Sequence, residues 1–341
     1  YLFNVSRYYL EEFHIDGYRL DVANEVTHDF WKAFRKLCKS INPDCLIMGE
    51  IWYDSSTYLR GDEFDSIMNY TYFDAIRGLL TNKFSIEEFI TIIERERGES
   101  SLTYYHNSNI LVGSHDTDRI YNAINHDKNK FIQAMTLLFT LPGSPILYYG
   151  DEKMMEGGKD PDCRRGMIFD EKYHQDSFNL VKKLIELKKL PCLKYGDIKF
   201  FETKEYLKFK RFINGESIYI ILNFKDKKIH INDFDGYINL ITKSPFDGII
   251  DGKGVVFIIN GNLSYAKYKI RWNNILKINN IFYYPLNINF KGSQAALYKN
   301  IFKYKPPCMY TGITMMDSKT ALDFINNIYK LKSKEIFKFL K

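Results

Sequence analysis

The hydrophobic pattern of this chain changes its period once, near Pro191, and that change limits the folds open to it. Before that point, short apolar runs alternate with longer amphipathic stretches, a pattern typical of βα units around a parallel sheet. After it the period becomes two, as in 206–212 and 217–223, which predicts antiparallel strands. We therefore expect an α/β unit over 1–190 and a small antiparallel β domain over 191–262.

Five strands are expected in the first part, and the stretches between them predict helices. The apolar runs that we assign to strands are 17–21, 46–50, 66–69, 110–113 and 146–149. Ser85 and Glu88 have the spacing of a capping box, which opens a helix that Gly98 can close, and a last helix is expected after Asp176. Five βα units in this length predict part of a (β/α)8 barrel, whose eight units usually need about 250 residues.

Composition excludes several classes of protein. Of the 341 residues 45% are hydrophobic, which is enough to bury one or two cores and excludes a disordered chain. No run approaches the roughly 20 uncharged apolar residues of a membrane helix, so a membrane is not an expected partner. The five cysteines lack both the spacing of a zinc ribbon and the density of a disulfide framework, which favours a reducing compartment, the cytoplasm.

The net charge of +6 is distributed unevenly along the chain. Residues 263–341 hold 14 Lys and Arg against three Asp and Glu, a net charge of +11, whereas residues 1–262 carry −5. A basic segment with aromatic residues could contact phosphates, but this one contains no recognisable nucleic-acid-binding module. Its Lys, Asn, Ile and Tyr content also arises when AT-rich sequence is translated, including in the wrong frame. We favour an extension unrelated to catalysis, leave its fold unassigned and do not expect a nucleic acid as partner.

Side chains at the carboxyl ends of parallel strands gather on one face of the sheet, and the first expected strand ends in Arg19-Leu-Asp21. Residues two apart on a strand point the same way, so the guanidinium lies beside the carboxylate and favours its ionised form. An ionised, positioned carboxylate can act as a nucleophile. An ordinary Arg–Asp ion pair that orients the strand end is the alternative.

The second expected strand ends at Glu50, which lies between Gly49 and the indole of Trp52. A carboxyl group beside an aromatic wall is desolvated and holds its proton more strongly, as a general acid requires. The alternative is a glutamate that is hydrogen-bonded within a loop.

His115 and Asp116 follow the fourth expected strand and offer a hydrogen-bond donor and a further charge to a ligand. A helix- or turn-capping role for Ser114 or Asp116 is the alternative. Three strand ends thus each deliver a carboxylate to the same face of the sheet. Two carboxylates about 5–5.5 Å apart, flanking a glycosidic bond, are the equipment of a retaining glycosidase, and a third can stabilise positive charge on the sugar ring.

Short stretches of the sequence resemble motifs of the α-amylase family of glycoside hydrolases. Three stretches resemble motifs of the family and follow one another in the family's order, at about its separation. They are GYRLDVANEV (17–26), GEIW (49–52) and GSHDTDR (113–119). Those that resemble the neopullulanase, cyclomaltodextrinase and maltogenic amylase group within it are VANEV (22–26), FDSIMNY (64–70), YYGDE (148–152) and EGGKDPDCRR (156–165). The resemblance covers about residues 1–250 and implies an amylase-type barrel followed by a small β-sandwich domain.

The resemblance also implies roles for individual residues. It makes Asp21 the nucleophile, Glu50 the general acid/base and Asp116 the transition-state stabiliser. Arg19 would orient the nucleophile, and His115 would hydrogen-bond the sugar at the cleavage point. Positions that would contact neighbouring sugars are Asn24, Glu25, Trp52, Asp160 and Arg164. A surface ion pair is the alternative for the last two.

The sequence departs from the family before Gly17, where the family's third-strand motif, which supplies an Asp and a His to the sugar pocket, has no counterpart. The resemblance therefore implies that this chain holds about the last five βα units of the barrel, and we expect it to be inactive or poorly folded by itself. Related enzymes often hold Ca²⁺, but the missing region would be expected to supply such ligands. No metal or cofactor is assigned, and the oligomeric state is left open.

Taken together, these residues predict a retaining hydrolase of α-glucosidic bonds in maltodextrins, cyclodextrins or related α-glucans, with an α-glucan or maltooligosaccharide as its partner. A transglycosylase or isomerase of the same family is one alternative. A catalytically silent relative that binds glycans or a partner protein is another. The presence of all three carboxylates favours the enzyme.

Overall fold

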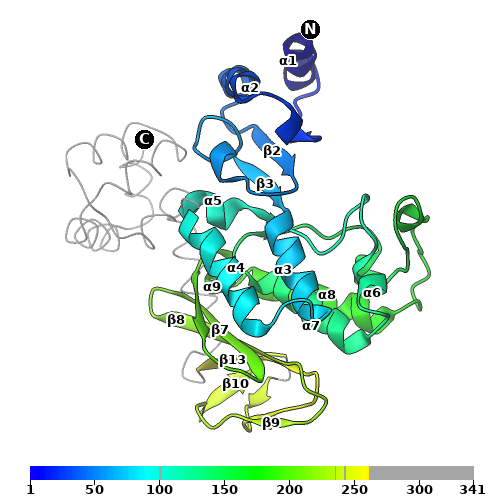
Figure 1. Cartoon of the computed structure of the whole chain (residues 1–341), viewed down its shortest axis with the longest axis vertical. Helices are drawn as coiled ribbons and strands as arrows, with labels where there is room; N and C mark the ends of the chain where they lie inside the picture. The colour runs from blue at the N-terminus through cyan, green and yellow to red at the C-terminus, as the bar shows by residue number, and fades with distance from the viewer. Residues whose placement is uncertain (100–101, 235, 242, 261–341) are drawn as a thin grey trace, which may run out of the picture.

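The computed structural model describes residues 1–99, 102–234, 236–241 and 243–260. The basic extension predicted at 263–341 lies outside these residues. The described part forms a parallel sheet with its helices, followed by antiparallel sheets, as the change of period predicts (Figure 1).

The parallel sheet holds five strands, and each strand pairs with the next one along the chain, in the order β1-β2-β3-β4-β5. The strands are β1 (Gly17–Leu20), β2 (Leu46–Ile51), β3 (Ser66–Asn69), β4 (Asn109–Ile110) and β5 (Ser144–Pro145). In register, Gly17 of β1 is paired with Leu46 of β2, and Met48 of β2 with Ser66 of β3. Because all four pairings are parallel, the carboxyl ends of the five strands lie at one edge of the sheet.

The last two strands differ from the prediction, which placed them at 110–113 and 146–149. Only two residue pairs form the ladder between β4 and β5. The amides of Ser144 and Ile146 donate to the carbonyls of Ser108 and Ile110 at 2.8 Å and 2.7 Å, and the two chains then diverge. Beyond β4, Leu111 and Val112 are buried in a loop, whereas residues 146–149 after β5 are partly or fully exposed.

Helices fill the connections and follow the local signals of the sequence. Their bounds are α1 (Leu2–Glu12), α2 (His28–Ile41), α3 (Tyr70–Leu80), α4 (Ile86–Glu99), α5 (Leu102–Asn107), α6 (Ile120–Ala123), α7 (Lys128–Thr140), α8 (Gln175–Lys188) and α9 (Pro191–Lys194). The capping box is present, since the Glu88 amide donates to the Ser85 hydroxyl at 3.1 Å and the Ser85 amide to the Glu88 carboxylate at 2.7 Å. Helix α4 continues through Gly98 instead of ending there, and α8 begins one residue before Asp176.

Antiparallel strands follow α9 and form two sheets. The larger sheet has the order β11-β10-β13-β8-β7-β6, and β9 pairs with β12 in a two-stranded sheet. The strands are β6 (Asp197–Phe201), β7 (Tyr206–Ile213), β8 (Glu216–Asn223), β9 (Ile229–His230), β10 (Tyr237–Asn239), β11 (Ser244–Pro245), β12 (Ile249–Ile250) and β13 (Val255–Asn260). Asn214 and Gly215, both with positive φ, form the tight turn between β7 and β8.

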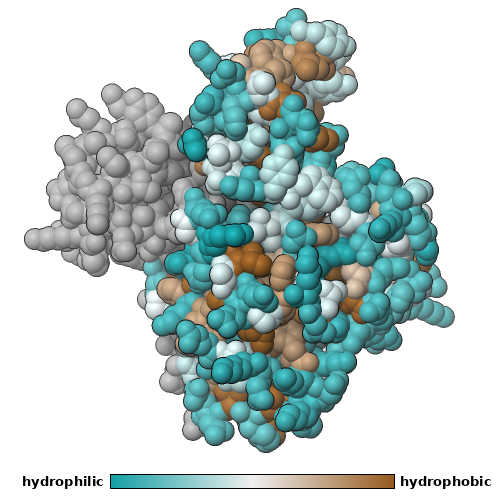
Figure 2. Space-filling model, in the orientation of Figure 1, coloured by the Kyte–Doolittle hydropathy of each residue, from teal (hydrophilic) through white to brown (hydrophobic). Residues whose placement is uncertain are grey.

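One hydrophobic core extends from helices α3, α4, α7 and α8 into strands β7, β8 and β13. A second core joins α1 and α2 to β1 and β2. Figure 1 shows the parallel strands, the helical layer and the antiparallel strands arranged in that order along the long axis. Figure 2 shows hydrophobic side chains open to solvent at α1, where Leu2 and Phe13 are more than half exposed. Among the described residues, no helix is long and apolar enough to cross a membrane.

Candidate active site

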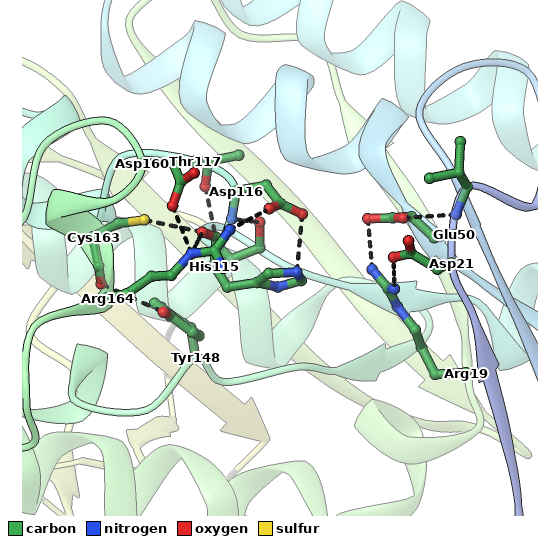
Figure 3. A network of polar contacts seen from close by, with 12 residues as sticks. Arg19, Asp21, Glu50, His115, Asp116, Thr117, Tyr148, Asp160, Cys163 and Arg164 are labelled. Atoms are coloured by element: carbon green, nitrogen blue, oxygen red, sulfur yellow. Dashed lines mark hydrogen bonds and ion pairs between the residues drawn. The ribbon is translucent and has the colours of Figure 1, made fainter.

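The carboxyl ends of β1 and β2 bring two of the predicted carboxylates together through one guanidinium group. Arg19, on β1, pairs with Asp21 through one terminal nitrogen and with Glu50 through the other, Nη2, at 2.6 Å (Figure 3). The backbone amide of Val22 donates to the second carboxylate oxygen of Glu50 at 3.0 Å. The two carboxyl groups therefore lie within the span of a single guanidinium.

The two carboxylates differ sharply in exposure. The side chain of Asp21 is 73% exposed and that of Glu50 is 2% exposed. Trp52, the indole predicted beside Glu50, stacks on Tyr70, with ring centroids 3.9 Å apart. The charged group in contact with Glu50 is the Arg19 guanidinium, which the sequence placed beside Asp21 alone.

Two glycines let these strands approach closely. A Cβ atom on Gly17 would lie 2.2 Å from the Leu46 carbonyl oxygen, and one on Gly49 would lie 2.8 Å from the ring of Phe64. Both positions require the absence of a side chain, since real Cβ atoms do not approach other heavy atoms so closely. Gly17 thus lets the starts of β1 and β2 approach closely, and Gly49 leaves room for the Phe64 ring beside the residue that precedes Glu50.

The third predicted carboxylate belongs to a second group of polar residues, on the loop after β4. His115 Nε2 lies 3.0 Å from Asp116 Oδ2, and Arg164 Nη2 lies 3.0 Å from Asp116 Oδ1. Arg164 also pairs with Asp160 through Nε at 2.6 Å. The Asp160–Arg164 pair is therefore part of the network around Asp116, rather than an ion pair isolated on the surface.

The buried Arg119 holds the loop after β5 against the loop after β4. Its Nε donates to the Cys163 carbonyl at 3.0 Å, and its Nη1 donates to the Tyr149 carbonyl at 2.7 Å and to Asp151 Oδ1 at 3.0 Å. The Cys163 thiol in turn donates to the His115 carbonyl at 3.0 Å. Complete burial raises the pKa of Asp151 to about 7, although Arg119 acts in the opposite direction.

Tyr70 lies between the two polar groups. It begins α3 directly after β3, and its side chain is 2% exposed. Burial raises its pKa to about 12, and the negative charges of Glu50 and Asp116 contribute in the same direction. Figure 3 shows the carboxyl groups of Glu50 and Asp116 pointing toward one another.

Asn24 and Glu25 lie on the short 3-10 helix Ala23–Glu25 that follows β1. Asn24 Nδ2 donates to Glu25 Oε1 at 3.2 Å, and Trp31 of α2 fixes the turn by donating to the Ala23 carbonyl at 2.8 Å. These residues therefore follow the same strand end as Asp21.

Comparison with known proteins agrees with this arrangement. Residues 1–189 match the family described as "Alpha amylase, catalytic domain". The chain belongs to the α-amylase family. It is 40% identical over 242 residues to a cyclomaltodextrinase of Thermoanaerobacter pseudethanolicus, an alignment that covers 69% of this chain and 42% of the relative. It is also 40% identical over 237 residues to neopullulanase 2 of Thermoactinomyces vulgaris, covering 67% of this chain and 40% of that enzyme. The chain thus spans about two-fifths of the length of these relatives.

Solved structures of the same family have a similar fold. A maltogenic amylase from S. marinus superposes with a TM-score of 0.70 at 31% identity, over 76% of this chain and 38% of that one. A cyclomaltodextrinase superposes with a TM-score of 0.71 at 30% identity, over 76% of this chain and 48% of that one.

The described residues contain no group of three or more His, Cys, Asp or Glu side chains that could hold a metal ion. Sequence analysis missed Tyr70, Arg119 and Asp151, although all three lie in stretches that resemble the family. Tyr70 follows a strand end directly, which is the signal that could have identified it.

Proposed function

We propose that this chain is a retaining glycoside hydrolase that cleaves α-glucosidic bonds in maltodextrins, cyclodextrins or related α-glucans. The observation that carries the proposal is the pairing of Arg19 with both Asp21 and Glu50 at the ends of β1 and β2, with the carboxyl group of Asp116 pointing toward that of Glu50 (Figure 3). Two carboxyl groups held by one guanidinium fit the short separation of a retaining pair better than the wide separation of an inverting pair. The names of the relatives support the substrate class.

In this mechanism, Asp21 attacks the anomeric carbon while Glu50 protonates the leaving oxygen, which gives a covalent glycosyl-enzyme. Glu50 then takes a proton from water, which attacks the same carbon and releases the sugar with net retention. Arg19 orients the nucleophile. Asp116, held by His115 and Arg164, stabilises the positive charge that develops on the sugar ring.

The neighbouring residues bind the rest of the substrate. His115 hydrogen-bonds the sugar at the cleavage point. The residues proposed to contact the adjoining sugars are Asn24, Glu25, Trp52, Asp160 and Arg164. Arg164 also positions Asp116, since the two side chains are 3.0 Å apart.

We further propose that the five parallel strands and their helices are about the last five βα units of a (β/α)8 barrel. The order β1-β2-β3-β4-β5 fits such a barrel, in which consecutive strands are neighbours. The barrel part would span 1–190 and a β-sandwich domain 191–262, because the family match ends at residue 189 and the antiparallel strands begin at Asp197.

The proposal is tested by incubating the 341-residue chain with maltotriose and β-cyclodextrin and following the products by ¹H NMR. Since this chain by itself is expected to be at best poorly active, we expect any release of sugars to be slow, with new reducing ends that are first α, which demonstrates retention. Asp21→Asn and Glu50→Gln should each lower the rate by at least 10³-fold, since each removes a covalent or proton-transfer step. Asp16→Asn, an exposed aspartate just before β1, is the matched control and should leave the rate unchanged.

Other products would identify the alternatives. Longer oligosaccharides or isomers from maltotriose would mean a transglycosylase or isomerase. Sugar binding without any turnover would mean a catalytically silent relative. A β-anomer as the first product, or equal rates for Asp21→Asn and Asp16→Asn, would exclude the mechanism.

A further inference from the structure

A histidine–carboxylate pair, His28 and Glu63, lies outside the proposed catalytic residues. His28 is the first residue of α2, and its Nδ1 atom lies 2.9 Å from each carboxylate oxygen of Glu63. The Glu63 side chain is 2% exposed, whereas the His28 side chain is 47% exposed. One edge of the imidazole is therefore engaged by a buried carboxylate while the rest of the ring is open to solvent.

The orientation of this imidazole is fixed from two sides. Its ring stacks on Tyr58, with centroids 4.4 Å apart and planes 30° apart. The loop that carries Glu63 is held by Arg35, which donates to the Glu63 carbonyl at 3.2 Å and to Asp65 at 2.7 Å. Because a carboxylate only accepts, Nδ1 carries a hydrogen and donates it. The other ring nitrogen, Nε2, is left to interact with a ligand.

The pair lies on the rim that carries the candidate active site. Tyr58 belongs to the loop after β2 and Glu25 to the loop after β1, and both loops leave the same edge of the parallel sheet. His28 follows Glu25 by three residues, and Glu63 lies where the loop after β2 returns to the start of β3. Burial raises the pKa of Tyr58, and the charges of Glu63 and Glu25 add to this shift. The rim thus continues from Glu50, which bonds the loop after β1, past Glu25 to His28.

We propose that His28 binds a glucosyl unit of the substrate beyond the one that contacts Glu25, and so extends the site to longer α-glucans. This inference depends on the proposed function. Sugars are bound by planar polar groups whose direction is fixed and by nearby aromatic faces, and His28 provides the first. Tyr53, which is 59% exposed and lies near Tyr58, provides the second.

Glu63 acts through His28 as a positioning residue. Without its carboxylate the imidazole loses the bond that selects its tautomer, and the ring is free to rotate. The effect of Glu63 on sugar binding should therefore disappear when His28 is absent. A pair that merely stabilises the start of α2 would change the stability of the protein but not its preference for sugar length.

The experiment measures sugar affinity in the full 341-residue chain carrying Glu50→Gln, which binds without turnover. Maltotriose and maltohexaose are titrated by calorimetry into this chain and into the same chain with His28→Ala, Glu63→Gln or both. Removing one hydrogen bond from a partly exposed site should weaken maltohexaose binding about three- to tenfold and leave maltotriose unchanged. The double variant should bind no more weakly than His28→Ala alone. His230→Ala, an exposed histidine on β9, is the control.

Several results would overturn the inference. One is an unchanged affinity of the His28→Ala chain for maltohexaose. Another is an equal loss of affinity for maltotriose and maltohexaose. The third is a loss of maltohexaose affinity no larger than that of the His230→Ala chain. Failure of the proposed function gives a different result, since the chain with native Glu50 would then not hydrolyse maltotriose while its melting temperature stayed normal. If the Glu50→Gln chain binds neither sugar while the chain with native Glu50 hydrolyses maltotriose, this inference is wrong and the proposed function stands.

Discussion

Arg211 provides a strong test of how the helical layer is joined to the antiparallel sheet. Its side chain lies on β7, is completely buried, and donates to the carbonyls of Thr140, Gly196 and Asp197. The first of these is the last residue of α7, so the guanidinium also faces the negative end of that helix. We expect Arg211→Met to loosen the contact between the two parts of the chain.

The magnitude follows from the groups left behind. Three buried carbonyls lose this donor, at about 1–3 kcal/mol each. Arg211→Met also removes a buried charge, so the folded variant avoids a desolvation penalty of several kcal/mol, which offsets part of this loss. The net loss should be about 3 kcal/mol, a large share of the 5–15 kcal/mol that stabilises a typical domain. With an m-value of about 3 kcal/mol per M, the urea midpoint should fall by about 1 M.

Equilibrium unfolding in urea, followed by circular dichroism, measures this shift. Lys210→Met is the matched control, because Lys210 is the adjacent residue of the same strand, is only half-buried, and points to the opposite face. Equal midpoints for Arg211→Met and Lys210→Met would refute the reasoning, because a buried guanidinium with three acceptors would then contribute no more than a partly exposed ammonium.

Two further predictions concern the catalytic part. Because the pKa of buried Asp151 is raised to about 7, the folded chain keeps a proton between about pH 4 and pH 7 that the unfolded chain has lost, so stability falls across this range as pH rises. Asp151→Asn should flatten that dependence, by up to about 4 kcal/mol, in thermal melts from pH 4 to pH 8, and an unchanged slope would contradict the assignment. Gly49→Ala should lower stability by about 1–3 kcal/mol, since its Cβ would lie 2.8 Å from the Phe64 ring. Gly98→Ala, which meets nothing within 4 Å, should instead stabilise helix α4 slightly in the same melts.

Local patterns predicted the first three strands well because each is an apolar run bounded by polar strand ends. The run 66–69 matches β3 at both ends, and 17–21 and 46–50 match β1 and β2 to within one residue. The last two strands were misplaced because hydrophobicity reports burial and not pairing. Leu111 and Val112 are buried without a ladder partner, because the pairing of β4 ends at Ile110.

Candidate site residues were predicted where a side chain stands at a strand end, and missed where the contact comes from elsewhere in the chain. The Asp21 and Glu50 positions follow from β1 and β2 directly. Arg119 lies within a recognised stretch, but its partners at Tyr149 and Cys163 come from another loop. The partner of His28 is 35 residues away. Such contacts depend on how loops pack, which no periodicity in the sequence records.

The residue after the proposed nucleophile shows where local preference gives way to function. Val22 has φ 42° and ψ 46°, a left-handed conformation that a β-branched side chain disfavours by roughly 1–2 kcal/mol. The same conformation turns the Val22 amide toward Glu50, to which it donates at 3.0 Å. Glu50 is thus held by this amide on one oxygen and by Arg19 on the other. The strain at Val22 is therefore offset by a hydrogen bond that joins the loop after Asp21 to Glu50. The position of Asp21 relative to Glu50 is thus set by a backbone amide as well as by the Arg19 side chain.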